Sequence, residues 1–187
     1  MKIRLGMSPI SWSNDDLPQL GGETPLEVCL AETRQAGFTG TENGGKFPTE
    51  AGALKSVLDD HDLALVSGWY SGTIINNDLA AEIEQITPQL TLFRDVGAPV
   101  IVYGETYETV QNRQERPLAS RPKLADFDVA AYGRRLTALA EHCADFGVPL
   151  TFHHHMGTAV EHETEIDQLM NHTGEAVKIL FDTGHMT

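Results

Sequence analysis

The sequence is poor in basic residues, in cysteine and in long hydrophobic stretches. It has 13 lysines and arginines against 27 aspartates and glutamates, which gives a formal net charge of −14. Proteins that bind a phosphate backbone normally carry a basic face, because neutralising the phosphates releases counterions and favours binding. With this excess of acidic residues, we expect no nucleic-acid partner. No run of about 18 apolar residues occurs, so we expect no transmembrane helix and no membrane partner.

The first residues and the cysteines indicate a compartment. Residues 1–6 (MKIRLG) lack the long apolar region of a secretory signal peptide. Cys29 and Cys143 are the two cysteines, and both fall in predicted helices, which is too little for a disulfide framework. The sequence therefore predicts a cytoplasmic protein whose thiols are buried or idle.

A dinucleotide-binding fingerprint is missing too, because no Gly-x-Gly-x-x-Gly follows the first predicted strand. What the sequence does show is a regular alternation of strand and helix patterns. Strands are expected to start near residues 3, 38, 63, 99, 148 and 177. Helices are expected after Thr24, which we predict as an N-cap, and over residues 49–60, 78–95, 128–145 and 161–172. This β-α alternation predicts a parallel sheet with right-handed crossovers.

Polar residues follow each predicted strand, which favours a barrel over an open doubly wound sheet. In a TIM barrel these residues would converge at the carboxyl-terminal mouth, where barrel enzymes place their sites. A barrel needs eight strands and about 250 residues, whereas this chain has 187 residues and six predicted strands. We therefore predict an α/β fold, a partial (β/α)8 TIM barrel of about six β-α units. It would form a single domain over residues 1–187, the N-terminal portion of a longer protein, with the last two strands missing. The residues expected at the mouth are Trp12, Glu42, Trp69, Tyr103, Glu105, His153, His155, Asp182 and His185.

Three consecutive histidines, residues 153–155, end the fifth predicted strand. Side chains alternate across a strand, so His153 and His155 share one face and His154 points the other way. Asp182 follows an apolar Leu-Phe pair and must be solvated, paired or metal-bound. Imidazole and carboxylate with open positions are a normal catalytic set for Mn, Fe, Co or Zn, so we predict a divalent metal.

Other candidates come from the first half of the chain and from the stretch between the fourth strand and the next helix. Glu42 is a candidate general base, with an exposed loop carboxylate as the alternative. Lys46 is a candidate for polarising a substrate oxygen, with an exposed lysine as the alternative. Trp12, Trp69 and Tyr70 are candidates for walls of a sugar-like pocket, with core packing as the alternative for each. The polar insertion over residues 105–126 is expected to be a lid or a substrate-contacting loop.

With these residues in view, the chain resembles the inosose (2-keto-myo-inositol) dehydratases, members of the xylose isomerase-like TIM-barrel superfamily. The resemblance implies that Asp182 binds metal and that His185 contacts substrate. It places the metal ligand of the fifth strand on His153, with His155 as second choice, although the superfamily usually has Glu there. The motifs that carry the resemblance are NDDLP (14–18), GGETPL (21–26), KFP (46–48), VSGWY (66–70), YGET (103–106), RPKL (121–124), HHHMGT (153–158) and FDTGH (181–185).

The resemblance implies a lyase of inositol catabolism, a hydro-lyase that dehydrates 2-keto-myo-inositol to a trihydroxycyclohexane-dione with Mn or Co. The expected partner is a small cyclic polyol ketone, and homo-oligomerisation stays open. The alternatives are a metal-dependent sugar isomerase or epimerase, a metal-dependent endonuclease, which the lack of a basic face argues against, and a catalytically inactive fragment. The residues implied are Glu42, Lys46, His155 and His185 for catalysis, and Trp12, Trp69, Tyr103, Glu105 and His185 for substrate binding.

Overall fold

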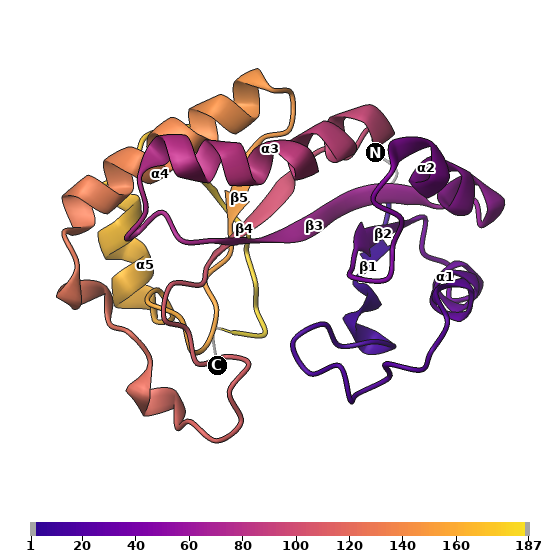
Figure 1. Cartoon of the computed structure of the whole chain (residues 1–187), viewed down its shortest axis with the longest axis horizontal. Coiled ribbons are helices and arrows are strands. Elements are labelled where there is room, and N and C mark those ends of the chain that lie inside the picture. The colour runs from indigo at the N-terminus through magenta and orange to yellow at the C-terminus, as the bar shows by residue number, and fades with distance from the viewer. Residues whose placement is uncertain (1–2, 186–187) are drawn as a thin grey trace. The chain divides into compact units, whose positions relative to one another are not determined.

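Strands alternate with helices along residues 3–185, the part of the chain that the computed structural model describes (Figure 1). The strands follow one another in the sheet in the order β1-β2-β3-β4-β5-β6, and the pairs β1–β2, β2–β3, β4–β5 and β5–β6 are parallel. The predicted α/β fold with a parallel sheet is therefore confirmed. The strands are β1 Gly6–Met7, β2 Gly40–Asn43, β3 Ala64–Gly72, β4 Ile101–Glu105, β5 Leu150–Phe152 and β6 Lys178–Ile179; the helices are α1 Leu26–Gln35, α2 Ala51–Asp60, α3 Leu79–Val96, α4 Val129–Asp145 and α5 Glu163–Met170.

The chain divides into two compact units. The first unit contains residues 3–69 and 91–100, and the second contains residues 70–90 and 101–185. The division falls inside β3 and inside α3, so each unit holds one part of both elements. The predictions of a single domain and of two missing strands stay predictions.

In the first unit, α1, α2 and β3 supply a leucine-rich core. Leu30, Leu54 and Leu65 are at most 3% exposed, and such a side chain contributes roughly 1.5–3 kcal/mol on burial. The prediction that Thr24 caps α1 is wrong, because the N-cap is Pro25, in an extended conformation. The Pro25 carbonyl accepts the first helical N–H groups, from Val28 and Cys29.

In the second unit, α4 presents a continuous apolar stripe to the core. Tyr132, Leu136, Leu139 and Cys143 recur at helical spacing and are completely buried. The helix begins at an N-cap, Asp128, whose carboxylate accepts the Ala131 N–H at 2.9 Å. Burial raises the pKa of the Cys143 thiol to about 12, which agrees with the expectation of an idle thiol.

Backbone hydrogen bonds continue past the ends of β5 and β6 and fix the segments that follow. The His153 N–H donates to the Tyr103 carbonyl at 2.8 Å, and the Leu180 N–H donates to the Phe152 carbonyl at 2.8 Å. The residues after β5 and those after β6 therefore emerge side by side. Within residues 3–185, the helices are too short or too polar to cross a membrane.

The polar insertion between β4 and α4 is anchored to the second unit. Val110 and Arg121 are each 5% exposed, and Leu124 is completely buried. Two short 3-10 turns, Leu118–Ser120 and Leu124–Asp126, give the segment regular structure. Its role as a lid or substrate loop stays a prediction, but a lid formed by this segment would have to release those three buried side chains.

Candidate metal centre

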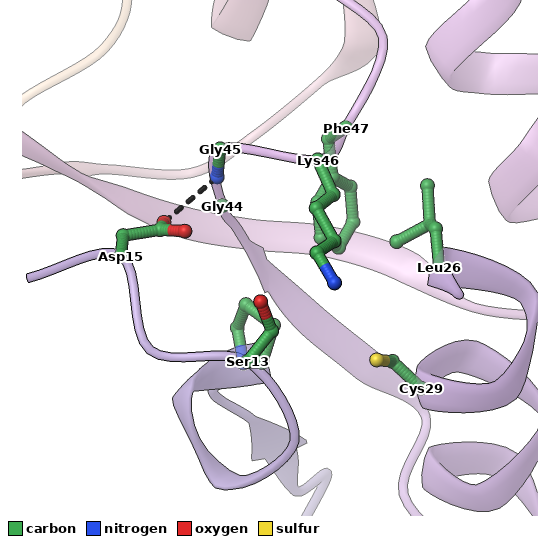
Figure 2. A pocket seen from close by; sticks show the side chains of 9 residues that line it. Ser13, Asp15, Leu26, Cys29, Gly44, Gly45, Lys46 and Phe47 are labelled. Atoms are coloured by element: carbon green, nitrogen blue, oxygen red, sulfur yellow. Dashed lines mark hydrogen bonds between the residues drawn. The ribbon is translucent and has the colours of Figure 1, made fainter. Parts of the chain in front are cut away.

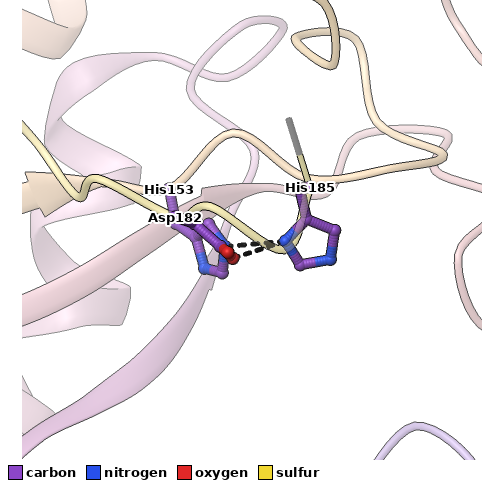
Figure 3. Close-up of side chains that lie close together, drawn as sticks. All are labelled: His153, Asp182 and His185. Carbon is purple, nitrogen blue, oxygen red and sulfur yellow. Dashed lines mark hydrogen bonds and ion pairs between the residues drawn. The ribbon is translucent and has the colours of Figure 1, made fainter. Parts of the chain in front are cut away.

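His153, Asp182 and His185 converge at the ends of β5 and β6 (Figure 3). His153 Nε2 lies 2.7 Å from Asp182 Oδ2, and His185 Nδ1 lies 2.5 Å from the same oxygen. The two ring nitrogens are 3.4 Å apart. Asp182 and His185 are three residues apart in a tight turn, where the Gly184 N–H donates to the other Asp182 oxygen at 2.7 Å. This turn lets one short segment supply two of the three donors.

The donor set fits a divalent metal. One nitrogen from each imidazole and one carboxylate oxygen all lie within 4.8 Å of one another. Tetrahedral ligands at about 2.0–2.2 Å from one ion lie about 3.3–3.6 Å from one another, so the carboxylate oxygen would have to move away from the two ring nitrogens by about 1 Å to admit an ion. His153 and Asp182 were predicted as ligands from the sequence. The geometry makes His185, which was predicted for catalysis and substrate contact, a third candidate ligand.

The electrostatics favour a neutral His153 beside an ionised Asp182, and metal ligands of these types need the same charge states. Burial lowers the pKa of His153 to about 4, although Asp182 works in the opposite direction. Burial works to raise the pKa of the Asp182 carboxyl, but hydrogen bonds from His185, the Gly184 N–H and His153 outweigh it and lower this pKa.

His155 lies next to this cluster, and its tautomer is defined by a backbone contact. Its ring centroid is 4.3 Å from that of His185. Its Nδ1 lies 2.8 Å from the Met156 carbonyl oxygen, which can only accept, so Nδ1 carries the proton. The neutral ring therefore has its lone pair on Nε2, the atom that can take up a proton. The neighbouring His154 is completely buried.

Glu105, a predicted substrate contact, is a buried carboxyl in a network of its own. It is 1% exposed and accepts from the Tyr103 hydroxyl at 3.1 Å and from the N–H groups of Ile75 and Tyr107 at 3.0 and 3.1 Å. Burial raises its pKa to about 8, with the charge of Glu82 acting in the same direction. The predicted substrate contacts of Tyr103 and Glu105 stay predictions.

The first unit holds the remaining predicted residues. Glu42 accepts a hydrogen bond from the Ser67 hydroxyl at 2.6 Å, because a register shift in the β2–β3 pair places these residues opposite each other. Trp12 is half-buried and donates to the Glu32 carboxylate at 2.5 Å. Trp69 is half-buried near the end of β3. The structure describes all of these side chains, and their roles stay predictions.

Lys46 lines a small pocket of the first unit (Figure 2). Its ammonium donates to the backbone carbonyls of Gly21 and Gly22, at 3.2 and 2.8 Å, and to that of Thr24. An ammonium has three donors, and these three carbonyls account for all of them. Lys46 therefore ties the loop before α1 to the loop after β2, a role that the sequence does not reveal. Its predicted part in catalysis stays a prediction.

Two features of the structure were not predicted from the sequence: His185 as a candidate metal donor and Glu82 as a buried carboxyl. The metal-donor position of His185 has a local signal, because Asp-x-x-His in a tight turn brings both side chains to one point. The buried carboxyl Glu82 has no such signal in its residue type, although its hydrogen-bond partners lie only 5 to 12 residues before it in the sequence. It accepts from the Tyr70 hydroxyl, from Thr73 and from Asn77 and is completely buried.

Comparison with known proteins identifies relatives over the whole length of the chain. Residues 30–187 match the family model described as xylose isomerase-like TIM barrel. The chain is 53% identical to the rhizopine catabolism protein MocC of Rhizobium meliloti, over 99% of the chain and 57% of that protein. It is 35% identical to an inosose dehydratase of Geobacillus thermodenitrificans, over 99% of the chain and 63% of that protein. The chain thus spans about three fifths of the length of these relatives.

A solved structure shows the same fold. A xylose isomerase-like TIM barrel protein from Mycobacterium smegmatis, in complex with magnesium, superposes with a TM-score of 0.70 at 15% identity. The superposition covers 97% of this chain and 65% of that protein. Together with the family match, this likeness confirms the predicted barrel relationship of the β-α units.

Proposed function

This chain belongs to the xylose isomerase-like TIM barrel family, and on that premise we propose that it carries the metal-binding part of a dehydratase for 2-keto-myo-inositol (inosose). The observation that carries the proposal is the convergence of His153, Asp182 and His185, with His155 beside them. Relatives named inosose dehydratase, at 35–36% identity, support the substrate. Because the chain spans only part of these relatives, the activity is proposed for the intact protein.

The metal proposed is Mn or Co, held by His153 Nε2, an oxygen of Asp182 and His185 Nδ1. When bound, a divalent ion polarises a ketone oxygen and an adjacent hydroxyl, which lowers the pKa of the carbon-bound proton between them. His185 would bind the metal and would also contact the substrate beside it. Its predicted contact with substrate is therefore kept in this proposal.

His155 is proposed as the base that starts the reaction. Its Nε2 accepts the proton from the carbon next to the ketone, and the C–H electron pair forms an enediolate. The electrons of the enediolate then expel the hydroxyl on the next carbon, which takes up a proton and leaves as water. The resulting enol tautomerises to the trihydroxycyclohexane-dione. Glu42 and Lys46 stay candidates for the proton donor, and Trp12, Trp69, Tyr103 and Glu105 stay candidates for substrate contacts.

The test is an ultraviolet assay for the enolic dione in the intact protein, with inosose as substrate and Mn²⁺ or Co²⁺ added. His155→Gln is expected to lower kcat by at least about 100-fold, the usual contribution of a general base. His172→Gln is the matched control, because His172 is exposed and its Nδ1 also bonds a backbone carbonyl, that of Gln168, at 2.7 Å. Equal activity of the two variants would refute the role of His155.

The substrate is tested with a panel. The 53% identical relative is named for rhizopine catabolism, so rhizopine is included beside inosose, together with ketohexoses. Formation of epimers without loss of water would favour the sugar isomerase or epimerase alternative over dehydration.

A further inference from the structure

Arg121, in the insertion between β4 and α4, is a buried arginine with a full set of partners. Its side chain is 2% exposed. Nε lies 3.1 Å from a Glu161 oxygen, and Nη2 lies 2.9 and 3.0 Å from the two Glu165 oxygens. Nη1 donates to the Thr158 carbonyl at 3.0 Å and to the Pro122 carbonyl at 3.1 Å. A buried guanidinium is costly unless it is paired, so this arrangement is held by all of its contacts together.

Apart from the carbonyl of its neighbour Pro122, the partners of Arg121 belong to the turn 156–161 and to the start of α5. Glu161 accepts the Gly157 N–H at 2.7 Å with the same oxygen that faces Arg121. Glu165 accepts the N–H groups of Glu161 and His162 at 2.9 and 3.1 Å. Arg121 is therefore connected to the backbone of the turn 156–161 both directly and through two carboxylates.

The same insertion holds the turn 156–161 at a second point. The Gly157 carbonyl accepts from the Val110 N–H at 3.0 Å and from the Thr109 hydroxyl at 2.9 Å. Gly157 has a φ of +82°, and a Cβ there would lie 2.9 Å from the Gln111 backbone nitrogen. The turn is thus held both by residues 109–111 and by Arg121.

The turn 156–161 in turn fixes His155. The His155 N–H donates to the Val160 carbonyl at 3.2 Å, and the His155 carbonyl accepts from the Thr158 hydroxyl at 2.8 Å. The contact that sets the His155 tautomer goes to the Met156 carbonyl, which is part of the turn. Any shift of the turn would move both the backbone and the ring of His155.

We propose that Arg121 is a positioning residue, which holds the turn 156–161 so that His155 stays beside His153, Asp182 and His185. This inference rests on the proposed function, because it assigns Arg121 to the step in which His155 removes a proton. It also gives the insertion a role other than that of a lid, namely a fixed support for the base.

The first test is kinetic and uses the intact protein with inosose and Mn²⁺. Arg121→Met is expected to lower kcat per folded molecule by about 30-fold or more, since a misplacement of about 1 Å can cost 10²-fold, while KM changes by less than about threefold. Arg116→Met, at an exposed arginine of the same insertion, is the control and should leave both constants unchanged. If Arg121 only stabilises the fold, Arg121→Met will lower the unfolding temperature but leave kcat per folded molecule unchanged, which overturns the proposal.

A double-mutant cycle shows whether Arg121 acts through His155. Because His155→Gln already removes the base, the double variant Arg121→Met/His155→Gln should be within about threefold of His155→Gln alone. Additive losses would contradict the proposal. If Arg121→Met does not fold, Arg121→Lys takes its place, since a lysine keeps the charge but cannot span both carboxylates and the carbonyls.

A readout without substrate separates the two proposals. Amide hydrogen exchange of residues 155–158 should be at least about tenfold faster in Arg121→Met than in Arg116→Met, because the turn opens more often. Unchanged exchange would overturn the positioning role. If the intact protein turns over none of the substrates, the proposed function fails, and the exchange measurement alone then decides the role of Arg121.

Discussion

His153 Nε2 lies 2.7 Å from Asp182 Oδ2, although 29 residues separate the two positions in the sequence. The contact exists because β5 and β6 are parallel neighbours, with His153 directly after β5 and Asp182 three residues after β6. The carboxylate also meets His185, so one anionic group faces two imidazoles. Asp182 is therefore the member of the cluster whose loss should matter most for a cation.

Replacement of Asp182 by alanine should abolish stabilisation by metal. A ligand that binds only the folded protein at 100 times its Kd raises the free energy of unfolding by about 2.7 kcal/mol. We expect an increase of this order in the wild type with saturating Mn²⁺ or Co²⁺ and almost none in Asp182→Ala, measured by thermal unfolding. Asp167→Ala, at an exposed position of α5, is the control and should respond like the wild type. An equal response of Asp182→Ala would contradict the metal site.

Replacement of Lys46 by methionine should destabilise the protein. The three carbonyls that accept from its ammonium would lose that donor, and we expect a loss of about 1–2 kcal/mol in the free energy of unfolding. Lys55→Met is the control. The Lys55 side chain is 62% exposed, and its ammonium lies 3.8 Å from an Asp59 oxygen, an exposed ion pair worth less than about 1 kcal/mol. Urea denaturation measures both. A fall in kcat without any loss of stability would contradict the structural role and favour the catalytic one.

Glu105 should make the protein less stable as the pH rises. Its pKa is about 8 in the folded protein and ordinarily 4.5, so the folded state holds a proton that the unfolded state releases. This contribution to stability is fully present below pH 4.5 and is lost as the pH rises to about 8. Relative to Glu105→Gln, the wild type should lose on the order of a few kcal/mol between about pH 5 and pH 8.

The matched control for Glu105 is Glu84→Gln, at an exposed position of α3. Its pH dependence should parallel that of the wild type, because histidines and other groups are the same in both proteins. Denaturant unfolding at several pH values gives the curves. A Glu105→Gln curve parallel to the wild type would show that the carboxyl is ionised in the folded protein.

Gly157→Ala should cost more stability than Gly147→Ala. Both glycines have positive φ, +82° and +93°, so alanine is strained by about 1–2 kcal/mol at either position. A Cβ at Gly147 meets nothing within 4 Å, whereas one at Gly157 approaches the Gln111 backbone. The difference in the free energy of unfolding between the two variants, measured in denaturant, therefore isolates the contact with the insertion. Equal losses would mean that the insertion can move away at no cost.

The alternation of strands and helices could be predicted from the sequence because it depends on local patterns. The sequence predicts Trp69 after the end of the third strand, whereas β3 continues to Gly72; glycines such as Gly68 and Gly72 have little intrinsic preference for strands. Pairing with β2 includes Ser67 and Gly68, and the Gly72 carbonyl accepts the Thr106 N–H at 2.7 Å.

The candidate site was predictable where its residues follow strands. His153 and Asp182 meet because parallel strands end at one edge. The burial of Glu105, the saturation of Lys46 by carbonyls and the enclosure of Arg121 depend on contacts between segments far apart in sequence. Residue type and spacing give no sign of such contacts. An exposed polar residue of a loop therefore cannot be told from a buried one that holds other segments in place.

Gly72, at the end of β3, leaves just enough space for the Tyr103 ring. A Cβ at this position would overlap the ring carbons and the hydroxyl oxygen. That hydroxyl donates to Glu105 and accepts from the Ile74 N–H at 3.2 Å. Every missense change at codon 72 would therefore displace the same phenol and break the same buried network, whatever the chemistry of the new side chain. In a saturation library, glycine should be the one amino acid retained at position 72, because the neighbouring Tyr103 ring leaves no space for a side chain.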